Sequence, residues 1–181
     1  MSLIKLHDKQ LITKARKGNQ QAFAAIVGRH EQGIRRIITG MLGQISGVDD
    51  IAQEVFIRFY KSINQFKGDA QLSTYLGRIA IRATLTAIEK RKKLNQRFPS
   101  SLTVVRDQRP NQYEAIDRLE LKDTIQSALN KISEDHRAVV VLRLVQGYSL
   151  EETATMLSLP KGTVASRLSR AQLALRKILK P

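Results

Sequence analysis

A turn between two short amphipathic segments near the C-terminus is the feature that most constrains the fold of this chain. Residues 149–152 (SLEE) have the spacing of a capping box, in which a serine and a glutamate side chain bond free backbone N–H groups at a helix start. Residues 157–160 follow as a turn, and Pro160 suits the first position of a second helix because its missing N–H would be unpaired there. The pattern predicts a helix-turn-helix over residues 148–178.

The second helix of this pair has one narrow apolar stripe, at three- and four-residue spacing, made of Val164, Leu168, Ala171, Leu175 and Ile178. Its other face presents only basic and small hydroxyl side chains: Lys161, Thr163, Ser166, Arg167 and Arg170. Such a face fits the major groove of DNA. Residues in the first turns of the helix would contact base edges, and the later basic residues would contact phosphates. An ordinary helical hairpin with a basic surface is the alternative.

Charge along the chain supports a polyanionic partner. The 181 residues include 31 Lys and Arg against 16 Asp and Glu, for a net charge of +15. Residues 78–97 and 161–181 form two basic runs, whereas the acidic residues concentrate between them, in residues 107–135. Two separate basic runs favour two contacts with one polyanion. Nucleic acid is the first candidate and an anionic membrane surface the second.

Composition also excludes several classes of protein. The chain has no Cys, so disulfides and metal–thiolate sites are excluded. No apolar run is long enough to span a membrane and no secretory signal is visible, so the cytoplasm is the expected location. His7, His30 and His136 lie in no catalytic or metal-binding motif, and no phosphate-binding glycine loop follows a strand. We therefore expect neither an enzyme nor a bound metal or cofactor.

The rest of the chain is predicted to be helical. Asp8 and Asn19 are candidate N-caps for helices over residues 8–17 and 19–41, and further helices are expected from Asp49 and over 74–93. Residues 138–145 (AVVVLRLV) are rich in β-branched residues and could form a strand. Because Ser133 can cap a helix and Gly147 can end one, their spacing favours a helix.

A stretch with Pro99, Pro110 and little periodicity divides the chain. We predict an all-α fold of two small helical domains, residues 1–94 and 113–181, joined by a flexible linker over residues 95–112.

Three motifs together resemble one known family. Residues 148–154 (YSLEETA) and 160–171 (PKGTVASRLSRA) resemble region four of the extracytoplasmic-function (ECF) sigma factors of bacterial RNA polymerase. Residues 49–56 (DDIAQEVF) resemble their region-two helix that binds the polymerase core. Residues 66–68 (FKG) and 74–80 (TYLGRIA) resemble their segment for recognising and opening the −10 element. The motifs also stand in the same order and at similar spacing.

The resemblance implies a non-enzymatic protein that directs polymerase to promoters, assists promoter opening and needs no cofactor. It implies three sets of contacts. The residues implied to bind the coiled coil of the largest polymerase subunit are Asp50, Gln53, Glu54, Ile57 and Arg58. Those implied to bind the −10 element are Phe66, Tyr75, Arg78, Arg82 and Lys90. Those implied to bind the −35 element are Lys161, Thr163, Ser166, Arg167 and Arg170.

Further partners implied by the resemblance are the flap region of the polymerase and an inhibitory anti-sigma protein, often membrane-bound. The family usually has Trp where Tyr75 stands and Asn where Arg82 stands, so the −10 sequence itself is not predicted. Hydrophobic core is the alternative role for Phe66 and Tyr75. A stand-alone helix-turn-helix regulator, which would bind its operator without polymerase, is the alternative function.

Overall fold

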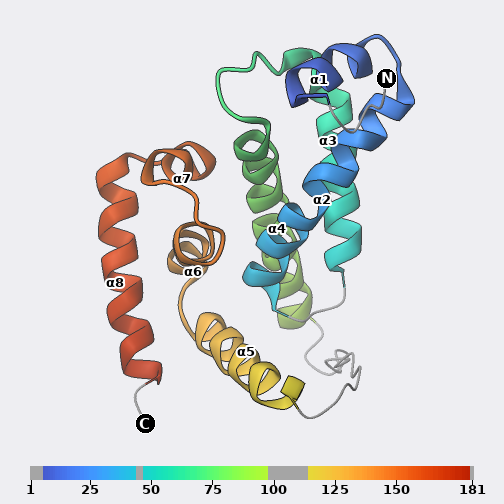
Figure 1. The fold of residues 1–181 in the computed structure, drawn as a ribbon. Helices are drawn as coiled ribbons and strands as arrows, with labels where there is room; N and C mark the ends of the chain where they lie inside the picture. The colour runs from blue at the N-terminus through green and yellow to red at the C-terminus, as the bar shows by residue number, and fades with distance from the viewer. Residues whose placement is uncertain (1–5, 44–46, 98–113, 180–181) are drawn as a thin grey trace.

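All the regular elements in the described part of the chain are helices (Figure 1). The computed structural model describes residues 6–43, 47–97 and 114–179, with only the backbone described for residues 114–120 and 122. The elements in order are α1 (Asp8–Arg16), α2 (Gln20–Leu42), α3 (Val48–Ser62), the 3-10 turn η2 (Ile63–Gln65), α4 (Leu72–Arg97), α5 (Glu114–Lys131), α6 (Glu134–Val140), the π-helical turn η3 (Val141–Val145), α7 (Leu150–Leu157) and α8 (Lys161–Leu179).

Helix starts follow the capping residues that the sequence offers. The Asn19 side chain accepts a hydrogen bond from the Ala22 N–H at 2.9 Å. Ser149 Oγ accepts from the Glu152 N–H at 3.1 Å while Glu152 Oε2 accepts from the Ser149 N–H at 2.8 Å, so the predicted capping box is confirmed. The predicted cap at Asp8 is wrong. His7 is the N-cap of α1, and the Asp8 carboxylate pairs with α2 instead.

The run at residues 138–145 is helical, as its flanks predicted. Its first part is buried on all sides, because Val139, Val140, Val141 and Leu142 are all at most 4 % exposed, whereas Leu144 and Val145 are exposed. α6 packs on α8 and also contacts α2, while η3 contacts α2 and α7. The last turn widens into a π-helix, in which the Gln146 N–H donates to the Val141 carbonyl at 2.9 Å.

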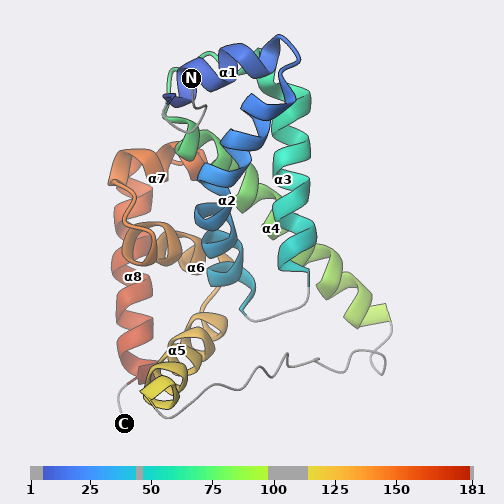
Figure 2. The same cartoon turned by 45° about the vertical axis from the view of Figure 1, so that its right-hand side comes forward.

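Helices α1–α4 form one half of the molecule and α5–α8 the other, and the two halves pack together. α7 lies against α4, and α6 lies between α8 and α2 in both views (Figures 1 and 2). The fit is close at two glycines. A Cβ on Gly40 would lie 2.9 Å from Val141 Cγ1, and one on Gly77 would lie 2.7 Å from Met156 Cε. The main hydrophobic core therefore runs through both halves, which the sequence did not predict.

The predicted linker, residues 95–112, falls largely outside the described residues. Its first part is helical, since α4 continues to Arg97.

One buried arginine joins the two halves. Arg137 of α6 is 8 % exposed and its guanidinium donates four hydrogen bonds to backbone carbonyls. Three acceptors lie at the end of α5 or just after it: Leu129 at 2.8 Å, Asn130 at 3.0 Å and Ile132 at 3.2 Å. The fourth, at 2.7 Å, is Met41 near the end of α2. Carbonyls in the last turn of a helix have no partner within it, so this cation serves the ends of two helices.

Replacing Arg137 with Met tests this role. The substitution keeps the apolar stem and removes the donors of four carbonyls, so we expect the free energy of unfolding to fall by about 3 kcal/mol. Urea denaturation followed by circular dichroism measures the change. Arg176→Met, at an exposed position on α8, is the control. Equal stability of the two variants would contradict the role assigned to Arg137.

Candidate nucleic-acid and polymerase interfaces

The helix-turn-helix is formed by α7 and α8 with a tight turn between them. Ser158 adopts a left-handed conformation (φ 56°) at the end of α7, and its N–H donates to the Thr155 carbonyl at 3.3 Å. Val164, Ala154 and Val139 form a small core that fixes the angle between the helices. Ala154 is small and buried at the point where the helices meet.

Four of the predicted −35 residues, Thr163, Ser166, Arg167 and Arg170, share the outer side of α8, and Lys161 is the first residue of the helix. Lys161, Ser166 and Arg170 are exposed, whereas Thr163 and Arg167 are partly buried. Two of these cations are already paired in the free chain: Lys161 Nζ lies 2.6 Å from Glu151 Oε1, and Arg167 Nη2 lies 2.9 Å from Asp135 Oδ2. The Lys161 hydrogen bond lowers the pKa of the Glu151 carboxyl. α8 itself carries no acidic residue.

The predicted polymerase-binding residues line the outer side of α3. Asp50, Gln53, Ile57 and Arg58 are exposed, and Glu54 is partly so. Arg58 Nε donates to Glu54 Oε1 at 2.7 Å, which lowers the pKa of the Glu54 carboxyl.

A groove beside this face was not predicted from the sequence. It lies between α2 and α3, has a volume of about 530 Å³, and includes Gln53 and Ile57 of the predicted set. Its other apolar lining residues are Phe23, Val27, Ala52, Phe56 and Tyr60. Tyr60 is 52 % exposed, and its ring packs edge-on against Phe23 with centroids 5.0 Å apart. Tyr60 could have been found from the sequence, because it follows Ile57 by three residues on the same helix face.

One end of this groove is charged. Arg35 of α2 pairs with Glu31 on the same helix at 3.0 Å and with Asp49 at the start of α3. These hydrogen bonds raise the pKa of Arg35. The two helices that line the groove are thus held together at that end by an ion pair.

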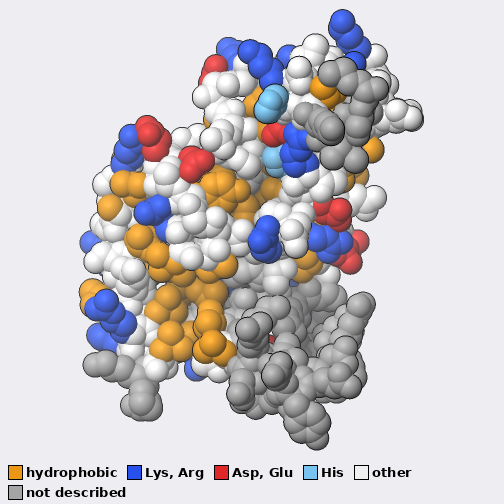
Figure 3. Space-filling model, in the orientation of Figure 1, with side chains coloured by type: hydrophobic (Ala, Val, Ile, Leu, Met, Phe, Trp, Pro, Cys, Tyr) orange, Lys and Arg blue, Asp and Glu red, His pale blue; other side chains and the backbone are white. Residues whose placement is uncertain are grey.

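Hydrophobic side chains are also exposed on the second half of the molecule. Figure 3 shows them gathered on the face where α5, α6 and α8 meet. The large exposed hydrophobic residues of these elements and of η3 are Leu121, Ile125, Leu144, Val145, Leu173 and Leu179, each at least 44 % exposed.

The two aromatic residues of the predicted −10 set lie within the first half. Phe66 is 8 % exposed and belongs to the hydrophobic core, and Tyr75 packs against that core. Their ring centroids are 4.9 Å apart, and both rings pack edge-on against Phe59. The structure thus places both rings among core aromatics, the alternative that the sequence left open, and it offers neither ring as an open stacking face.

The three basic residues of that set lie along α4. Arg82 is exposed, and its Nη2 donates to Ser158 Oγ at 3.3 Å, at the end of α7. Arg78 is partly buried, and its Nε is buried without a hydrogen-bond partner. Lys90 is exposed further along the helix. α7 therefore reaches across part of the face of α4 that was predicted to meet DNA.

Each half of the chain matches a known protein family. The sigma-70 region 2 family matches residues 26–94, and the sigma-70 region 4 family matches residues 122–175. The chain belongs to the ECF family of RNA polymerase sigma factors. Sigma factors are not enzymes, which agrees with the motif analysis.

Full-length relatives agree with this assignment. The ECF RNA polymerase sigma factor SigW of Bacillus subtilis is 36 % identical over 95 % of this chain and 96 % of its own length. The ECF RNA polymerase sigma-E factor of Escherichia coli K12 is 28 % identical over 97 % of this chain and 96 % of its own.

Two solved structures share the fold. CnrH, solved in complex with the cytosolic domain of CnrY, aligns with a TM-score of 0.70 and 26 % identity over 95 % of this chain and 96 % of its own. The RpoE sigma factor of Bartonella quintana, solved with the anti-sigma factor NepR, shows the same fold with a TM-score of 0.72, at 24 % identity over 87 % of this chain and 96 % of its own.

Two further observations concern sites of other kinds. Among residues 6–43, 47–97 and 114–179, no helix is long and apolar enough to cross a bilayer. The same residues contain no cluster of three His, Asp or Glu side chains able to hold a metal ion.

Proposed function

We propose that this sigma factor binds core polymerase through α3 and the adjacent groove, the −35 element through α8, and the −10 element through α4 and the loop before it. The observation that carries this proposal is the absence of acidic residues from α8, the second helix of the helix-turn-helix. The same chain also contains the residues that match the sigma-70 region 2 family. The stand-alone regulator is not favoured, because it gives the region-two half no role.

The polymerase contact is supported by the chemistry of the α3 face. The polar side chains of Glu31, Arg35, Asp49, Gln53 and Lys61 line the edges of an apolar groove that contains the exposed side chains of Ile57 and Tyr60. An apolar centre with a polar rim is the usual anatomy of a protein interface. The exposed hydrophobic residues of α5, η3 and α8 offer a second such surface for the flap region of the polymerase.

The −35 contact is supported by the pairing pattern on α8. Lys161 and Arg167 hold carboxylates in the free chain, and phosphates or base edges can replace these partners. Exposed ion pairs contribute little to stability, so exchanging them costs little.

Promoter spacing requires that the two halves separate on DNA. The −10 and −35 elements lie about 25 base pairs apart, which is about 85 Å of B-DNA. A compact chain of 181 residues has a radius of gyration of only about 16 Å. We therefore propose that the closed arrangement is the form that does not initiate transcription, and that polymerase and promoter draw α5–α8 away from α1–α4.

An anti-sigma partner fits the same scheme. CnrH, whose complex contains the cytosolic domain of CnrY, aligns with nearly the whole closed chain. A protein that contacts both α1–α4 and α5–α8 binds the closed arrangement more tightly than the separated halves, so its binding stabilises the closed arrangement. Its effect is to keep this sigma factor from polymerase in the cytoplasm or, if the partner is membrane-bound, at the membrane.

Replacing Arg167 and Arg170 together with Ala tests the −35 assignment. We expect run-off transcription with core polymerase to fall about 30-fold or more on a promoter selected from genomic fragments by the wild-type protein, because each arginine contributes about 1–3 kcal/mol to such contacts. Transcription from the same promoter without its −35 element should not change. Arg176→Ala is the control, since it lies half a turn around α8 from Arg167. Unchanged output from the double variant would refute the assignment.

Replacing Gln53 and Glu54 with Ala tests the polymerase assignment. We expect affinity for core polymerase to fall about tenfold or more, because Gln53 lines the groove and Glu54 lies beside it on the predicted docking face, whereas thermal stability stays near the wild-type value. Fluorescence anisotropy with labelled sigma factor measures the affinity. The matched control is Glu89→Ala with Gln96→Ala, at exposed positions on α4. Equal affinity of the two double variants would show that the docking face lies elsewhere.

A further inference from the structure

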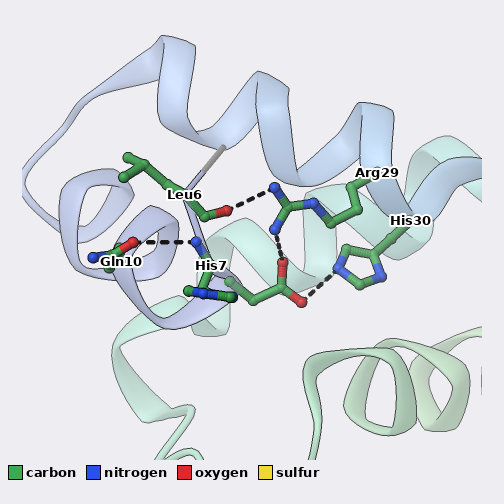
Figure 4. Close-up of polar contacts among 6 residues, drawn as sticks. Leu6, His7, Gln10, Arg29 and His30 are labelled. Carbon is green, nitrogen blue, oxygen red and sulfur yellow. Dashed lines mark hydrogen bonds and ion pairs between the residues drawn. The ribbon is translucent and has the colours of Figure 1, made fainter. Parts of the chain in front are cut away.

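The N-terminal helix α1 lies outside the residues that match the region 2 family, which begin at 26. It is nevertheless fixed to the first half at both of its ends. At its start, Asp8 Oδ1 accepts from Arg29 Nη1 at 2.6 Å and Asp8 Oδ2 lies 2.9 Å from His30 Nε2 (Figure 4). Arg29 Nη2 also donates to the Leu6 carbonyl at 2.7 Å. Leu11, Ile12 and Ala15 bury the inner side of the helix.

At its other end, α1 holds the loop that precedes α4. Arg16 Nε donates to the Ile63 carbonyl at 3.0 Å, and Arg16 Nη2 donates to the Phe66 carbonyl. These two carbonyls bracket η2, where the chain leaves α3 and enters the loop. One guanidinium thus fixes the direction in which residues 66–71 leave the core, and its planar fork suits two acceptors at once.

A groove lies between α1 and this loop. It has a volume of about 560 Å³, within the range of sites that hold a small molecule or a nucleotide. The charged side chains that line it are Lys9, Arg16, Arg29, Lys67 and one acid, Asp8. The acid is already paired with Arg29, whereas Lys9 and Lys67 are exposed at the two walls. Thr13, Gln71 and Ser73 add neutral donors. The groove therefore suits an anionic ligand with polar edges.

We propose that α1 is part of the site for the unpaired −10 strand: Arg16 is a positioning residue for the 66–71 loop, and Lys9 and Lys67 bind backbone phosphates of the strand that enters the groove. This inference rests on the proposed function, because it takes the loop before α4 as a −10 contact. Cationic grooves that follow the backbone are the general means of holding single strands. It gives a role to α1, which lies outside the residues that match the region 2 family.

The test uses full-length sigma factor, core polymerase and two forms of one promoter. One form is fully paired and the other carries mismatches that keep the −10 region unpaired. For Lys9→Ala with Lys67→Ala, we expect about tenfold weaker binding of the holoenzyme to the pre-opened form. The plot of log affinity against log salt should also become shallower by about 1.4, the value for two phosphates on a single strand. Lys14→Ala, on α1 but outside the groove, is the control and should match wild type.

Arg16→Ala should reduce capture of the pre-opened strand about tenfold while leaving affinity for core polymerase unchanged. Arg16→Lys should be intermediate, since one ammonium cannot serve both carbonyls with the same geometry. Variants with wild-type affinity and salt slope would overturn the proposal. If Arg16→Ala lowers strand capture and core affinity equally, Arg16 has only a structural role, which contradicts the role proposed for it. If Arg16→Ala does not fold, the double lysine variant tests the proposal. If the wild-type holoenzyme does not open the promoter, the proposed function fails first.

Discussion

The buried guanidinium of Arg137 is the interaction on which the arrangement of this protein depends. A charge taken out of water is costly unless its donors are all satisfied, and here backbone carbonyls rather than a carboxylate meet them. Burial lowers the pKa of Arg137. Three of its four bonds stay within α5–α8 and one crosses to Met41. The cation therefore organises the second half by itself and ties it to the first through a single bond.

This division of bonds makes separation of the halves feasible. When they part, Arg137 keeps its three local partners and exchanges only the Met41 carbonyl for water, so the second half does not lose its organising contact. Other contacts across the interface include apolar packing at Gly40 and Gly77, the hydrogen bond from Gln126 Nε2 to the Gly40 carbonyl, and the ion pair of Lys92 with Glu134, 2.6 Å apart. Among the described residues, the interface is close-fitting and contains no buried ion pair that would have to be broken.

Closure also affects the DNA-binding surfaces unequally. α7 covers part of α4, where Arg82 bonds Ser158 and the Arg78 Nε is buried without a partner. The outer side of α8 stays open, apart from its two ion pairs with carboxylates. In the proposed function, the −10 surface is therefore restrained by the second half of the same chain, whereas the −35 surface is accessible before the halves separate.

Local features were predictable from the sequence because local rules determine them. Asn19, Ser133 and Ser149 cap the expected helices, and the flanks of residues 138–145 correctly favoured a helix over a strand. Contacts between the halves were not predictable. Gly40 and Gly77 look like ordinary helix glycines until a neighbour from the other half fills the space beside them, and Arg137 looks like a surface residue. Residue type alone also could not separate a stacking role for Phe66 from its place in the core.

In the proposed function, the two halves are packed together in the free chain and separate on a promoter. Because the chain has no cysteine, spin labels can be attached at Thr86→Cys on α4 and Gln172→Cys on α8, both exposed positions, and their separation measured by pulsed electron paramagnetic resonance. The account predicts a single distance below about 40 Å, the diameter of a compact chain of this length, and a distance beyond about 60 Å in the complex with polymerase and promoter. The same short distance in both states would contradict it.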